Sequence, residues 1–308
     1  MPFTSAEVAS LDWVSAIDRS PLTVAPECPV LEVIEQMGQH SSAHPDGAPD
    51  RSCALVLESG QVQGIFTERD IVRLSADEAD LSTQTVRDVM VSPVHTVNLL
   101  SLSDVFAVLF LFRRHKIRHL PVIDEQGRLS GIVSQASLRS VLRPANLLKL
   151  QRVGDVMSTH VISASPQSSV LRVTKLMAQH RVSCVVLVEK ISDNRLSPVG
   201  IITERDIVQF QTLRFDLGTL SAQEMMSSPL ILLEPEDSLW HANQEMKRHR
   251  IRRLVVSWNW GRNLGLVTQT SLLRAFDPME MYNIIESLQQ TIQQLEAKNL
   301  ALQQQANL

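Results

Sequence analysis

The segment GIFTERDIV at residues 64–72 returns almost unchanged as GIITERDIV at residues 200–208. Two altered relatives, GIVSQASL from Gly131 and GLVTQTSL from Gly265, lie between and after these copies. The four leading glycines are separated by 67, 69 and 65 residues. A steady period of this length, with near-identical copies alternating with altered ones, predicts four repeated units arranged as two pairs.

Composition limits the kinds of protein that this chain can form. Its 308 residues fit about two domains of ~100–200 residues, and its net charge of −4 gives no general attraction to nucleic acid or membrane lipid. The richest apolar run, residues 105–112, is far shorter than the ~20 residues of a membrane span. Three scattered cysteines and dispersed histidines match no disulfide framework or metal-ligand spacing. We therefore expect a cytoplasmic protein that binds no metal, no nucleic acid and no membrane.

Each unit has the same pattern of secondary-structure signals. In the first unit a short extended piece at residues 22–24 precedes a helix that places Val30, Ile34 and Met37 on one face. A strand at residues 53–57 and a second strand ending at Phe66 follow, and Thr67 opens another helix. The order strand, helix, strand, strand, helix in every unit predicts an α/β fold.

At these residues the chain resembles the cystathionine beta-synthase (CBS) domain family. The resemblance lies in the DVM openings of the units, the IRHLPVID strand at residues 117–124 and the four glycine corners. It covers nearly all of residues 17–276 and implies that two units pack into one module and that two modules can form a flat disc, as in the gamma subunit of AMP-activated protein kinase. The domains expected are residues 1–145 and 146–277. The family implies a regulatory protein, not an enzyme, that binds an adenine nucleotide (AMP, ADP or ATP).

The repeated TERD corner is the first candidate for ligand chemistry. Thr67 and Asp70 lie where a strand passes into a helix, and the free N–H groups and dipole of a helix start favour a phosphate. Asp70 can accept the hydroxyls of a ribose, and Thr67 can donate to a phosphate oxygen. The same T-x-x-D spacing is also that of a helix capping box, so both interpretations remain open.

Acidic and basic residues are divided between the units of each pair. The odd units carry Asp70 and Asp206, whereas the even units have Ser137 and Ser271 at that position. The even units instead carry basic runs at residues 115–119 and 249–253. A nucleotide needs an acceptor for its ribose and cations for its phosphates, so this division favours a nucleotide over a simple cap. The alternative for the basic runs is a solvated helix end.

The family resemblance assigns roles to individual positions, and these are expectations. Ribose and phosphate contacts of the first and second modules fall on Thr67, Asp70, Arg118, His119, Thr203, Asp206, Arg252 and Arg253. The adenine is expected near Val24, Ala54, Ile162 and Val186.

The segment 278–308 departs from the repeat. Ile285, Leu288, Ile292 and Leu295 alternate at intervals of three and four, which predicts a coiled-coil helix and, with the CBS modules, a homodimer. A lone amphipathic helix remains the alternative. Two further functions also stay open: the input region of a longer signalling enzyme, such as a sensor kinase or nucleotide cyclase, and a dimerisation platform without ligand.

Overall fold

The computed structural model describes residues 13–39, 51–99, 101, 105–142, 147–192, 195–259 and 261–274. The predicted coiled coil at residues 278–308 lies outside these ranges. Within them, the strands form four three-stranded sheets, one for each repeated unit. The predicted α/β class and the order of elements in each unit are confirmed.

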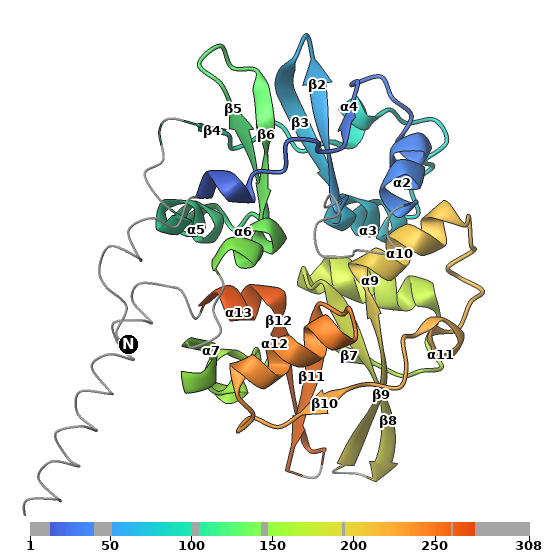
Figure 1. The fold of residues 1–308 in the computed structure, drawn as a ribbon. Coiled ribbons are helices and arrows are strands. Elements are labelled where there is room, and N and C mark those ends of the chain that lie inside the picture. The colour runs from blue at the N-terminus through green and yellow to red at the C-terminus, as the bar shows by residue number, and fades with distance from the viewer. Residues whose placement is uncertain are drawn as a thin grey trace, which may run out of the picture.

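The first two units occupy the upper half of the molecule in Figure 1. The first contains η1 (Trp13–Ala16), β1 (Thr23–Val24), α2 (Val30–Gly38), β2 (Cys53–Glu58), β3 (Gln61–Thr67) and α3 (Glu68–Ala76). The second contains α4 (Val86–Val89), β4 (Val97–Asn98), α5 (Val105–His115), β5 (His119–Ile123), β6 (Leu129–Ser134) and α6 (Gln135–Leu142).

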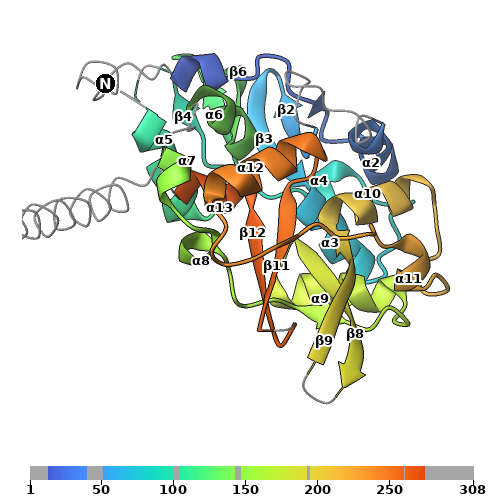
Figure 2. The ribbon, with the colours of Figure 1, turned by 60° about the horizontal axis from the view of Figure 1, so that its bottom comes forward.

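The third and fourth units form the lower half, and Figure 2 shows their sheets next to each other. The third contains α7 (Leu147–Leu150), α8 (Val153–Val156), β7 (Ser163–Ala164), α9 (Val170–His180), β8 (Cys184–Ser192), β9 (Arg195–Thr203) and α10 (Glu204–Thr212). The fourth contains α11 (Ala222–Met225), β10 (Leu232–Leu233), α12 (Leu239–Arg248), β11 (Arg253–Trp258), β12 (Asn263–Thr268) and α13 (Gln269–Arg274).

Every sheet has the same topology. A two-residue strand pairs in parallel with the first long strand, which pairs antiparallel with the second, as in β1-β2-β3. The two sheets of a pair pack against each other: Leu55 and Ile65 of the first unit share a buried cluster with Ile132 of the second. Val186 and Val255 do the same for the third and fourth units. The predicted pairing of units is therefore visible in the cores, and we call units one and two the first pair and units three and four the second pair.

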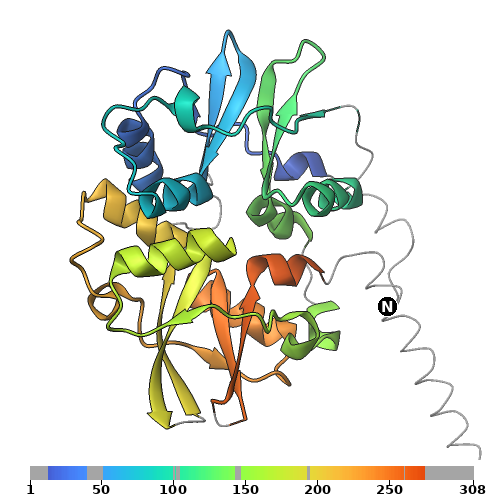
Figure 3. The ribbon, with the colours of Figure 1, turned by 180° about the vertical axis from the view of Figure 1, so that it is seen from behind.

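Helices meet where the two pairs face each other. Figures 1 and 3 show α3, α9 and α10 between the sheets of opposite pairs, with α6 and α13 beside them. The cores cross this boundary, because Val72 of α3 belongs to the core cluster of the third unit. Val208 of α10 belongs, in return, to the core of the first. The helices that begin at the repeated TERD corners thus join the two pairs.

None of the helices in the described part of the chain is long and apolar enough to cross a membrane. The three cysteines form no disulfide, and Cys53 and Cys184 are buried while Cys28 is half-buried.

Candidate functional site

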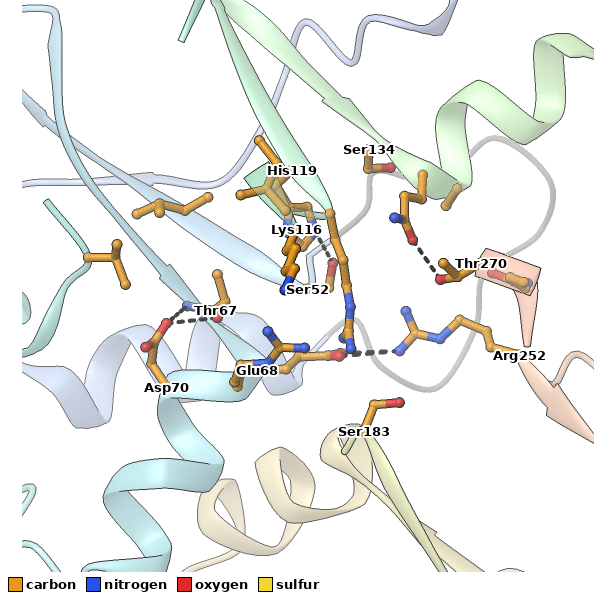
Figure 4. Close-up of a pocket in the computed structure, with 18 of the residues that line it drawn as sticks. Ser52, Thr67, Glu68, Asp70, Lys116, His119, Ser134, Ser183, Arg252 and Thr270 are labelled. Carbon is orange, nitrogen blue, oxygen red and sulfur yellow. Dashed lines mark hydrogen bonds and ion pairs between the residues drawn. The ribbon is translucent and has the colours of Figure 1, made fainter. Parts of the chain in front are cut away.

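A cavity of about 280 Å³ lies where all four units meet (Figure 4). This volume is near the lower end of the ~300–1,000 Å³ typical of small-molecule sites. The first three units contribute polar side chains to its lining, including Thr67, Asp70, Arg118, His119 and Ser183, and the fourth contributes Arg252, Arg253 and Thr270. The cavity is therefore shared between the pairs rather than enclosed by one of them.

The corner of the first pair has the geometry of a helix cap. The Thr67 backbone N–H donates to Asp70 Oδ2 at 3.0 Å, and the Thr67 hydroxyl donates to the same oxygen at 2.7 Å. Asp70 Oδ1 lies 3.6 Å from the Arg73 guanidinium. Both Thr67 and Asp70 also line the cavity, so the capping box and a place at a ligand site coexist at this corner.

The corner of the second pair has the same local geometry but a different setting. Asp206 Oδ2 accepts from the Thr203 N–H at 2.7 Å and from its hydroxyl at 2.8 Å. Neither residue lines the cavity. Burial raises the pKa of the Asp206 carboxyl, although the two Thr203 hydrogen bonds oppose this shift. The two corners that look equivalent in the sequence are therefore not equivalent in the structure.

Arg118, predicted to bind phosphate, contacts a carboxylate of the opposite pair. It donates to Glu204 Oε2 at 2.7 Å, and Glu204 is only 1% exposed. Arg69 and Arg253 lie 3.7 and 3.8 Å from the same carboxylate. Burial alone would raise the pKa of the Glu204 carboxyl, but Arg118, Arg253 and Arg69 together hold it below the ordinary glutamate value.

Arg252 of the fourth unit forms the matching contact with the first unit. Its guanidinium donates to Glu68 Oε1 at 3.2 Å, and Arg205 lies 3.7 Å from the same oxygen. Figure 4 shows Glu68 and Arg252 pointing toward each other across the cavity. Each pair therefore supplies a buried carboxylate to an arginine of the other.

His119 and Arg253 occupy equivalent positions and contact equivalent serines. His119 Nε2 lies 2.7 Å from Ser52 Oγ, and Arg253 Nε donates to Ser183 Oγ at 3.2 Å. Both contacts join the two units within a pair. The predicted site residues Arg118, His119, Arg252 and Arg253 are thus all brought to the cavity.

The four positions predicted to contact adenine do not line the cavity. Val24 and Ala54 are buried in the core of the first unit, and Val186 is buried in the cluster shared by the third and fourth units. Ile162 is half-buried and packs against the core of the third unit. A contact of these residues with a base stays a prediction.

Several charged residues of the site were missed by sequence reasoning, among them Glu68, Arg69 and Glu204. Glu68 and Glu204 are the glutamates of the two TERD corners. That both copies carry glutamate at this position was the signal that could have identified them. Lys116 lies within the basic run of the second unit and faces the cavity (Figure 4). In the described ranges, no group of three or more histidine, cysteine or acidic side chains is placed to hold a metal ion.

Comparison with known proteins agrees with this architecture. An uncharacterized 33.4 kDa protein of a ribosomal RNA operon in Thermofilum pendens is 28% identical over 280 residues, which are 82% of this chain and 87% of that protein. A solved structure from Methanocaldococcus jannaschii, proposed as an archaeal homolog of g-AMPK, has a TM-score of 0.69 at 18% identity. The alignment covers 85% of this chain and 99% of that one. An uncharacterized conserved protein from Pyrococcus horikoshii has a TM-score of 0.55 at 16% identity, over 84% of this chain and 97% of its own.

These solved structures show likeness of fold alone. The family model of the CBS domain, however, matches this chain four times, at residues 14–77, 86–144, 153–212 and 222–278. The matches span well over half of the sequence and coincide with the four units of the structure. The chain therefore belongs to the CBS domain family as a protein of four tandem repeats.

Proposed function

We propose that this protein is a regulatory sensor of an adenine nucleotide, which binds in the shared cavity. The observation that carries the proposal is the cavity itself, where the Thr67–Asp70 corner of one pair opens toward arginines from both pairs. In this proposal Asp70 accepts from the ribose hydroxyls, and the cations contact the phosphate. Because the site spans both pairs, occupancy can alter how the pairs pack and so reach a partner or an attached output domain.

The charge of the cavity supports a phosphate-bearing ligand. Five cationic side chains line it against the carboxylates of Glu68 and Asp70: Arg69, Lys116, Arg118, Arg252 and Arg253. AMP, ADP and ATP are anions, whereas S-adenosylmethionine carries a net positive charge and is disfavoured by this surplus. We therefore favour AMP, ADP or ATP as the ligand.

We expect one nucleotide per chain in this cavity. Thr67 and Asp70 line it, but Thr203 and Asp206 do not, so only the first corner offers a ribose acceptor to this cavity. Division of the chain at residues 145/146 into two modules, and the absence of enzymatic activity, remain part of the proposal.

The test is calorimetric titration of the whole chain with AMP, ADP, ATP, S-adenosylmethionine and adenosine. Asp70→Asn should weaken binding of the preferred nucleotide about tenfold, because hydrogen bonds to a charged group contribute roughly 1.5–3 kcal/mol against about 1 for a neutral one. The matched control is Asp88→Asn. Asp88 makes the same capping box with Thr85, at 2.9 and 2.7 Å, but on the exposed surface away from the cavity. Equal affinities for the wild type and Asp70→Asn would contradict the assignment of the ribose contact.

A dimerisation platform without ligand is the second candidate. It is favoured by the ion pairs that already hold Arg118 and Arg252. In that case none of the five ligands would give heat of binding. An input region for a kinase or cyclase is compatible with the sensor and concerns only what the signal reaches.

A further inference from the structure

The glutamate and arginine of each TERD corner contact those of the other corner across the boundary between the pairs. Arg69 Nε lies 3.7 Å from Glu204, and Arg205 Nε lies 3.7 Å from Glu68. Each of these two corners therefore places its arginine beside the glutamate of the other corner. This arrangement places two buried carboxylates next to the cavity, where each is surrounded by guanidinium groups.

The same two carboxylates hold the cations that a ligand phosphate needs. Glu204 accepts from Arg118 at 2.7 Å, and Glu68 accepts from Arg252 at 3.2 Å. A carboxylate and a phosphate present similar acceptor oxygens to the fork of an arginine, so they compete for the same N–H groups. Lys116 also lines the cavity, but none of the acidic side chains described by the structure forms an ion pair with it.

We infer that Glu68 and Glu204 are specificity-determining residues of the cavity, because they act as internal anions that the phosphates of a ligand displace from Arg252 and Arg118. The inference rests on the proposed function. A bound nucleotide contacts Lys116 and takes over arginines from both pairs, so it replaces an internal link between the pairs with its own. Only a ligand with enough negative charge makes this exchange, and neutral adenosine does not.

The inference predicts a gain of affinity on removing an acid. Glu68→Gln removes the carboxylate that competes for Arg252, and we expect it to tighten binding of pyrophosphate and AMP about tenfold, since one charge-assisted hydrogen bond contributes roughly 1.5–3 kcal/mol. Adenosine should bind equally to both proteins. Glu78→Gln is the control: Glu78 also pairs across the boundary, with Lys175 at 2.6 Å, but it is exposed and lies outside the cavity. This control makes the same change of net charge and should leave affinity unchanged.

A double-mutant cycle tests the partner of Glu68. Arg252→Gln should weaken AMP binding although Arg252 belongs to the fourth unit, whereas Arg250→Gln, in the same basic run but exposed, should not. In the double variant Glu68→Gln with Arg252→Gln, the gain in affinity for AMP should disappear. This variant removes both the carboxylate and the guanidinium of the pair. Unchanged or weaker binding of pyrophosphate and AMP by Glu68→Gln would overturn the inference.

The titrations separate this inference from the proposed function. If adenine nucleotides bind the wild type and Glu68→Gln equally well, the displacement is wrong and the sensor stands. If pyrophosphate binds more tightly to Glu68→Gln but no adenine nucleotide binds either protein, the displacement stands and the adenine-nucleotide sensor is wrong.

Discussion

At the scale of single residues, Glu204 is a buried carboxylate with three arginines beside it. Its carboxylate is 1% exposed and lies within 4 Å of Arg118, Arg69 and Arg253. Replacement by glutamine leaves these guanidinium groups without their buried counter-charge, and loss of one partner of a buried pair costs about 3–5 kcal/mol. We expect Glu204→Gln to lower the free energy of unfolding by about 3 kcal/mol or more in urea titrations.

Glu78→Gln again provides the comparison, because it removes an ion pair across the same boundary. Its carboxylate and Lys175 are 60% and 43% exposed, so the effect should stay within about 1 kcal/mol.

The folded-state pKa of Glu204 is lowered, so the contribution of Glu204 to the free energy of unfolding is present above the ordinary value of about 4.3 and is lost as pH falls through the folded pKa. Similar losses for the two variants would show that burial of Glu204 adds nothing.

The residue scale also shows what the sequence could and could not predict about the site. Thr67 and Asp70 were predicted because their spacing within one corner is local information. Arg118 was predicted to bind phosphate, but its partner Glu204 is 86 residues away in the opposite pair. Such a contact depends on how the two pairs pack, and no local spacing specifies that packing. Glu68 and Glu204 were missed for this reason.

At the scale of elements, each corner glycine packs against the first segment of the other unit in its pair. A Cβ added to Gly64 would meet Met90, and one added to Gly200 would meet Met226. Gly265 faces Met157 in the same way, and Gly131 faces Ile17 and Asp18. The sequence predicted the four corners and the order of the elements, because both follow from the repeat. It did not predict this exchange of openings, which gives a physical reason for glycine at all four positions.

The exchange predicts unequal effects of adding a methyl group at these corners. A Cβ on Gly131 would lie 2.6 Å from the Asp18 carbonyl oxygen, and Gly131 has a φ of +154°. The Asp18 backbone cannot yield easily, because Asp18 and Ile132 exchange two backbone hydrogen bonds of 2.9 Å. We expect Gly131→Ala to cost about 2 kcal/mol or more.

Gly64→Ala meets a methionine side chain, which adapts its shape more readily, so a cost nearer 1 kcal/mol is expected. Thermal unfolding of the two variants side by side measures the difference. A larger loss for Gly64→Ala would mean that the Met90 packing, rather than the backbone contact, limits what these corners tolerate.

At the scale of the whole molecule, the two pairs share their cores. Val72 and Val208 occupy the same position of the repeat, each is 3% exposed, and each belongs to the core of the unit across the boundary. A further cluster runs without interruption from Val105 of the second unit to Leu239 of the fourth. Separation of the pairs would therefore expose apolar surface on both, at a cost of roughly 25 cal/mol per Å².

This sharing predicts that the four units unfold together. Val72→Ala and Val208→Ala should each cost about 2 kcal/mol, as expected for a methyl-deleting change in a packed core, and each should shift the whole calorimetric transition. Val91→Ala, at a side chain that is 50% exposed, should leave the transition in place. The calorimetric and van't Hoff enthalpies should agree, because neither pair keeps an intact core without the other. Two resolved transitions, with Val72→Ala moving only one of them, would show instead that the pairs unfold as independent domains.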